Sequence, residues 1–165
     1  MLRQVNRETV GAVVSRVFAQ AAFLFPEPAD APPPLAADDR QFLRVGVRFE
    51  GTRSGLVELI LPVELCTEIA ANMLGTDPES AALPDYREDA ARELVNIITG
   101  QLLTELYGGR EKFRQSPPSI VQLTPDYLAA VLESPDLVCV LVDESPVLVT
   151  CTETKGAYEH QGVDC

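Results

Sequence analysis

Hydrophobic residues in the first half of the chain change their spacing twice, from helical to alternating and back to helical. Over residues 4–25 they recur at three- and four-residue steps, which predicts a helix. Residues 42–49 alternate between apolar and polar side chains, and residues 56–61 read as a returning strand after the turn GTRSG, so we expect a β-hairpin. Helical spacing returns over residues 63–74, and Gly75 is a natural C-terminal stop for that helix.

The segment PEPADAPPPLAADD, residues 26–39, separates the first helix from the hairpin. Its prolines favour extended backbone without hydrogen-bonded partners, so we expect either a connector that runs around the fold or a loose loop.

A long helix is predicted over Glu88–Tyr107, closed by Gly108 and Gly109, after a loop at residues 76–86. On a helical wheel its core side carries Ala91, Leu94, Val95, Ile98, Leu102 and Leu106. The opposite side carries a narrow polar stripe made of Asp89, Glu93, Asn96, Gly100 and Thr104, with Ile97 and Leu103 at its two edges.

The last third of the chain returns to β-structure. Residues 119–123 predict a short strand, residues 136–154 predict a hairpin that turns at DESP, and residues 125–132 fit helix and strand equally well. Strands that come in hairpins rather than alternating with helices predict an α+β fold, a mostly antiparallel sheet with two or three packed helices. We expect one domain over residues 1–155 and a polar tail over residues 156–165.

Composition removes several classes of function. The chain has 165 residues and a net charge of −12, which disfavours binding to nucleic acid and to anionic membranes. One histidine, His160, is too few for a His-based triad or a multi-His metal site, and the four cysteines form no Cys-x-x-Cys pair. The chain also lacks a Gly-rich phosphate loop, so no nucleotide cofactor is expected. No apolar run is long enough to span a bilayer and the N-terminus lacks a signal sequence, so we expect a cytoplasmic protein.

The polar stripe has two interpretations. Surface helices ordinarily carry a solvated polar face, and Glu and Asn at this spacing fit that role. However, Gly100 in the middle of a helix costs about 1 kcal/mol relative to Ala, which suggests that something approaches the backbone there. Ile97 and Leu103 beside the stripe would then be apolar contacts for a partner that covers it.

The pattern Asp89-x-x-x-Glu93-x-x-Asn96, followed by Gly100 and by the pair Pro117-Pro118, resembles the signature of the CheC/CheX/FliY phosphatases of bacterial chemotaxis. The resemblance is greatest to the single-site CheX type, and it extends to the hairpin and helix before the motif. CheC-type members carry a second Glu-x-x-Asn motif, but the first predicted helix here has Gly11 where the amide would stand, so we expect one site.

The resemblance implies a substrate, the phosphoryl-aspartate of a CheY-like receiver domain. In this interpretation Asn96 orients the attacking water and Glu93 anchors the helix to the lysine of the receiver. Asp89, Ile97, Gly100 and Leu103 would contact the partner. The chain would need no cofactor of its own, because Mg²⁺ would belong to the receiver.

Other interpretations belong to a different class of protein. The same fold occurs in flagellar switch proteins, which bind partners and catalyse nothing, so a non-catalytic switch-like scaffold or a receiver-binding module remains an alternative. A homodimer through a sheet edge, offered by the hairpin at residues 136–154, is also expected from the resemblance, although an ordinary internal strand pair fits this hairpin equally well.

Overall fold

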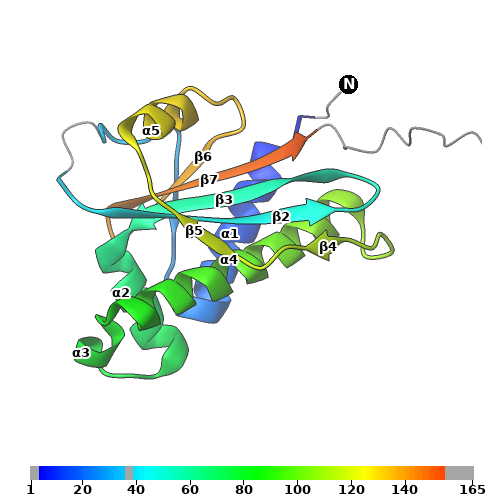
Figure 1. Cartoon of the computed structure of the whole chain (residues 1–165). Coiled ribbons are helices and arrows are strands. Elements are labelled where there is room, and N and C mark those ends of the chain that lie inside the picture. Colours follow the sequence, from blue (N-terminus) through cyan, green and yellow to red (C-terminus); the bar gives the residue numbers. More distant parts are fainter. Residues whose placement is uncertain (1–3, 36–38, 155–165) are drawn as a thin grey trace, which may run out of the picture.

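A seven-stranded antiparallel sheet forms the centre of the computed structural model, which describes residues 4–35 and 39–154 (Figure 1). The strand order is β1-β6-β7-β3-β2-β4, and β5 also pairs with β2. Every pair is antiparallel, which confirms the predicted α+β class. The strands are β1 (Glu27–Ala29), β2 (Phe42–Glu50), β3 (Ser54–Pro62), β4 (Arg114–Gln115), β5 (Ser119–Val121), β6 (Val138–Val142) and β7 (Ser145–Thr154).

Helices cover both faces of the sheet, but unequally (Figure 1). The three long helices, α1, α2 and α4, lie on one face, and α5 lies alone on the other. None of the helices in the described ranges is long and apolar enough to cross a membrane. The helices are α1 (Arg7–Ala22), α2 (Val63–Leu74), α3 (Pro78–Ala81), α4 (Pro84–Tyr107) and α5 (Pro125–Leu132).

Local sequence signals explain where the helices begin and end. The side chain of Asn6 caps α1 by accepting from the backbone N–H of Glu8, so the helix begins at Arg7. The helix ends at Ala22, so it is shorter at both ends than the predicted range 4–25. Gly75 ends α2 with φ = 63°, as expected of a glycine cap.

The prediction of a loop over residues 76–86 is partly wrong. Asp77 caps the short helix α3, and Pro84 occupies the first turn of α4, so α4 starts four residues before the predicted Glu88. Residues 125–132, whose spacing fits helix and strand equally well, form the helix α5. Thr124 caps this helix by accepting from the backbone N–H of Tyr127.

Alternation along the strands divides the apolar side chains between two cores. Val57, Leu59 and Leu61 of β3 face the three long helices and belong to the larger core. Ile60 faces the opposite side, where it packs in a smaller core under α5. The face of the sheet that carries the larger core therefore supports α4. The side of α4 that points away from the sheet stays available for contacts with other molecules.

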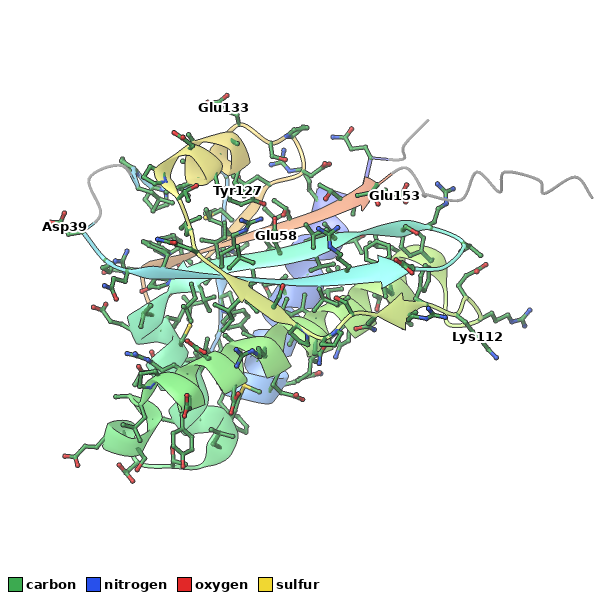
Figure 2. All side chains as sticks on the ribbon, in the orientation of Figure 1. Asp39, Glu58, Lys112, Tyr127, Glu133 and Glu153 are labelled. Carbon is green, nitrogen blue, oxygen red and sulfur yellow. The ribbon has the colours of Figure 1, made fainter. Side chains whose placement is uncertain are left out.

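Polar contacts attach α5 to the sheet. Glu58 of β3 is buried and accepts a 2.7 Å bond from Nε of Arg44, while the hydroxyl of Tyr127 donates to its other oxygen. Figure 2 shows Tyr127 beside Glu58 under α5. Burial, and then the bond to Glu58, raises the pKa of Tyr127 above its ordinary value. This carboxylate is fully engaged in holding the fold.

The Pro-rich segment corrects one expectation. Glu27–Ala29 does not form unpaired backbone but pairs with Cys139–Leu141 of β6 as an edge strand. Proline is tolerated at a sheet edge because its missing N–H faces away from the ladder. The hairpin of β6 and β7, which turns at Asp143 and Glu144, is therefore covered on its outer side, and its expected free edge is occupied over three residues. The tail expected at residues 156–165 lies outside the described residues.

Candidate functional site

The candidate site lies on α4, which packs against α1, α2 and the sheet. Its inner side is buried over Ala91, Leu94, Val95, Ile98 and Leu102, as the helical wheel predicts, and Leu106 is half-buried. Thr99, a polar residue in this core, donates its hydroxyl to the Val95 carbonyl oxygen at 2.7 Å. These contacts fix the rotation of α4 and hence the direction of its polar stripe.

Asn96 lies at the centre of the outer side and is half-buried. Within the described part of the chain its carboxamide makes no hydrogen bond, so neither its oxygen nor its NH₂ group is engaged by the fold. It lines an open depression of about 370 Å³, together with Arg16, Ile97, Gly100, Gln101, Thr104 and Glu105. An unbonded amide at the wall of an open depression can bind water or a polar group of a partner.

The two carboxylates of the stripe differ in their contacts. Glu93 is exposed and forms no ion pair among the described residues, so it is available to an external cation. Asp89 is also exposed, but it accepts from Nη1 of Arg92 at 3.2 Å. Arg92 also forms an ion pair through Nη2 with Oε2 of Glu88, at 3.4 Å. Asp89 is therefore partly neutralised, whereas Glu93 is not.

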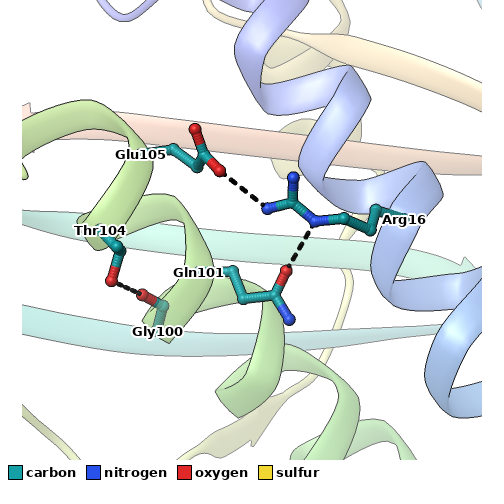
Figure 3. A network of polar contacts seen from close by, with 5 residues as sticks. All are labelled: Arg16, Gly100, Gln101, Thr104 and Glu105. Atoms are coloured by element: carbon teal, nitrogen blue, oxygen red, sulfur yellow. Dashed lines mark hydrogen bonds and ion pairs between the residues drawn. The ribbon is translucent and has the colours of Figure 1, made fainter. Parts of the chain in front are cut away.

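Gly100 is not required by the packing of its own chain. Among the residues that the structure describes, a methyl group at this position would meet only Nε2 of Gln115, at 3.7 Å, which is an ordinary contact distance. The carbonyl oxygen of Gly100 accepts from the Thr104 hydroxyl at 3.1 Å (Figure 3). The glycine thus leaves space for a methyl group on the outer side of α4, with no closer neighbour than Gln115 among the described residues.

The two apolar residues at the edges of the stripe do not share one environment. Ile97 is half-buried and packs against the larger core. Leu103 is only 4% exposed, so the expectation that it flanks the stripe at the surface is wrong. Leu103 is a core residue because α4 contacts other elements on several sides, which widens its buried arc. A partner cannot reach it on the folded surface.

The sequence analysis missed the contribution of α1 to this surface. Arg16 donates from Nε to Oε1 of Gln101 at 3.1 Å and pairs through Nη2 with Oε1 of Glu105 at 3.1 Å (Figure 3). The helical spacing of α1 places Arg16 opposite the core, but only the fold brings it beside α4. One wall of the depression is thus a polar bridge between two helices.

Neither metal ligands nor reactive thiols accompany the stripe. Among residues 4–35 and 39–154, no three His, Cys, Asp or Glu side chains are grouped as they would be around a metal ion. Burial raises the pKa of the Cys66 thiol to about 12, and that of Cys151 to about 12 as well. The chemistry available on α4 is therefore that of an amide and a carboxylate that position other groups.

Comparisons with solved structures show that the fold is shared with chemotaxis proteins. The chemotaxis protein CheX from Vibrio vulnificus superposes with a TM-score of 0.68 at 16% identity, covering 92% of this chain and 99% of that one. A CheC-like superfamily protein from Shewanella gives 0.65 at 16% identity, over 90% and 96%. CheX in a CheX–CheY–BeF3–Mg²⁺ complex from Borrelia burgdorferi gives 0.61 at 15% identity, over 93% and 100%.

Comparison by sequence gives a narrower result. No curated protein matches the chain. The family model described as chemotaxis phosphatase CheX matches residues 45–141, a range that runs from β2 to β6 and includes the whole of α4. Since this match covers more than half of the 165 residues and the fold agrees with it, the chain belongs to the CheX family of chemotaxis phosphatases.

Proposed function

We propose that this protein accelerates hydrolysis of the phosphoryl-aspartate of a CheY-like response-regulator receiver. Asn96 orients the attacking water, and Glu93 anchors α4 to the receiver lysine. The observation that carries the proposal is the state of Asn96, whose carboxamide is unbonded within the described residues and lines an open depression on the outer side of α4.

The chemistry needs little more than positioning. An acyl phosphate is already activated, and the receiver supplies its own acidic residues, Mg²⁺ and lysine, so the missing part is a water held in line with the phosphorus. A carboxamide is no base at neutral pH, but its oxygen can accept from that water while its NH₂ group donates to a neighbouring oxygen. No cofactor bound by this chain is part of the proposal.

The geometry of Glu93 fits an anchoring role. Glu93 precedes Asn96 by three positions, so the two residues lie about 4.5 Å apart along the axis of α4 and on the same side of it. Because Glu93 is exposed and has no ion-pair partner among the described residues, pairing with a lysine would not break an existing contact. Exposed Asp89 and the gap at Gly100 would extend the contact surface, and half-buried Ile97 would add apolar area.

The partner class has support from one relative. The Borrelia burgdorferi CheX is described in complex with CheY, BeF3 and Mg²⁺. We infer that this chain also meets a phosphorylated receiver of the CheY type, and that both proteins are cytoplasmic. A homodimer through the sheet edge stays a separate proposal, since β1 already pairs with part of that edge.

The test times the loss of phosphate from a receiver labelled with a small-molecule phosphodonor, using CheY-like receivers of the same organism. Wild-type protein is expected to shorten the half-life of the phosphorylated receiver in catalytic amounts. Asn96→Ala is expected to abolish the acceleration and to keep its circular dichroism spectrum and melting temperature, because Asn96 makes no hydrogen bond within the described residues. Full activity of Asn96→Ala would refute the mechanism.

The same assay, combined with a binding measurement, distinguishes the phosphatase from the non-catalytic alternatives. A receiver-binding module would bind the phosphorylated receiver and leave its half-life unchanged or longer. A switch-like scaffold would bind without regard to Asn96. Either result would replace phosphatase activity as the function of this surface.

A further inference from the structure

The docking surface of α4 continues onto α1 through Arg16. We propose that Arg16 is a specificity-determining contact of this surface, which binds a carboxylate on the receiver next to its phosphorylation site. This inference rests on the proposed function, and it adds a residue of the partner contact that lies outside the motif on α4.

The surface around Asn96 carries mostly negative charge. Asp89, Glu93 and Glu105 are all exposed along α4, and the chain carries a net charge of −12. Among the described residues that line the depression beside Asn96, Arg16 is the only basic one. The acidic residues that the receiver would carry at its phosphorylation site would be repelled by a surface of purely negative charge. Arg16, although it is paired with Glu105, is the basic group lining this depression that can still donate to such a carboxylate.

Arg16 is already held in place by two side chains of α4. Its Nε and Nη2 atoms are fixed by Gln101 and Glu105, both at 3.1 Å, so its long side chain has little freedom left to lose on binding. Two of its five N–H donors are used in these bonds within the described residues, and 41% of the side chain is exposed. Free donors on a fixed guanidinium suit a carboxylate, which accepts two parallel N–H bonds.

Arg16 contacts α4 beyond the position of Asn96. Gln101 and Glu105 follow Asn96 by five and nine residues, or about 7.5 and 13.5 Å along the axis of α4. The two side chains that hold the guanidinium are thus attached to α4 more than one turn beyond Asn96. Arg16 thus acts on binding of the receiver and not on the chemical step.

The alternative is that Arg16 merely joins two helices. Exposed ion pairs contribute little to stability, so Arg16→Ala is expected to leave the melting temperature nearly unchanged under either interpretation. Stability alone cannot distinguish the two roles. Kinetics and binding can distinguish them, because a residue that only joins α1 to α4 is not expected to alter the affinity for the receiver.

The experiment measures receiver dephosphorylation at varied receiver concentration, at two salt concentrations, for wild type, Arg16→Ala, Arg16→Lys and Arg7→Ala. We expect Arg16→Ala to raise KM about tenfold with kcat unchanged, and to weaken the salt dependence of KM. Arg16→Lys keeps the charge but loses the planar fork, so its KM should be intermediate. Arg7→Ala removes the same charge from an exposed position on the same helix outside this depression and should match wild type.

A second readout does not depend on hydrolysis. The dissociation constant for the beryllofluoride-activated receiver with Mg²⁺ should rise by the same factor in Arg16→Ala. If the wild type binds the receiver without accelerating hydrolysis, the proposed function is refuted. The role of Arg16 is then still tested by the dissociation constant of the complex. Equal constants for Arg16→Ala and wild type, a loss confined to kcat, or an equal effect of Arg7→Ala would each overturn the role of Arg16, as would failure of the wild type to bind any receiver.

Discussion

The hydroxyl of Tyr107, in the last turn of α4, donates a 2.7 Å hydrogen bond to Oε1 of Glu153 in β7. The Glu153 side chain is only 3% exposed, and its other oxygen pairs with Nη1 of Arg53 at 3.3 Å. Burial, and then the bond to Glu153, raises the pKa of Tyr107 well above its ordinary value. The C-terminal end of the site helix is thus tied to the sheet by a buried carboxylate.

Tyr107→Phe should therefore destabilise the fold. The substitution removes a hydrogen bond to a buried charged acceptor, and we expect a loss of about 1–3 kcal/mol in the free energy of unfolding, measured in urea. Tyr86→Phe is the matched control, because Tyr86 is exposed and its hydroxyl has no partner among the described residues. A Tyr107→Phe variant as stable as Tyr86→Phe would show that the bond contributes nothing.

Glu93→Ala should weaken binding of the phosphorylated receiver more than it slows the chemical step. Glu93 is exposed, so its removal should leave the melting temperature unchanged, while KM rises about tenfold through loss of one charge-assisted contact. Glu93→Gln, which keeps the shape without the charge, should behave similarly. A variant with unaltered affinity for the receiver would refute the anchoring role.

Gly100→Ala should separate stability from function. The added methyl group meets nothing closer than 3.7 Å, and alanine is the better helix former by about 1 kcal/mol, so the melting temperature should rise by about 2–4 °C. If a partner approaches the backbone at Gly100, the same methyl group will raise KM for the receiver. A more stable variant with an unchanged KM would show that the glycine has no role in docking.

Alkaline pH should weaken the fold through Cys66. Burial raises the pKa of this thiol from 9.0 to about 12, so between these values the unfolded chain loses a proton that the folded chain keeps. The free energy of unfolding should then fall as pH rises above about 9, with up to about 1.4 kcal/mol per pH unit from this one group. Urea unfolding at pH 8 and pH 10.5 should show a shallower decline for Cys66→Ala than for wild type, and equal declines would contradict the assignment.

Signals that act over a few residues were sufficient to predict much of the fold. The helix over residues 63–74 ends at Gly75 as predicted, because a single glycine in the left-handed region defines its stop. The hairpin of β2 and β3 follows from the near-alternation of apolar and polar side chains over residues 42–49 and from the turn GTRSG, which are both local signals. Pairing of Glu27–Ala29 with β6 was missed, because partners more than a hundred residues apart leave no local signal.

The site could be predicted only along α4. At 100° per residue, the buried residues from Ala90 to Leu103 span about 220° of the helix, wider than the arc of a helix packed on one side. The sequence could not reveal that width, and Leu103 was misplaced for this reason. Arg16 was missed because its contacts with Gln101 and Glu105 join residues 85 and 89 positions apart.

The short strand β1 has a consequence for self-association. A second copy that adds a strand along β6 must first detach residues 27–29 from Cys139–Leu141. The rate of such joining would then be limited by a unimolecular opening step and would stop rising with protein concentration. Pro28, which has no N–H to offer to an incoming strand, further disfavours extension of the sheet across β1 itself.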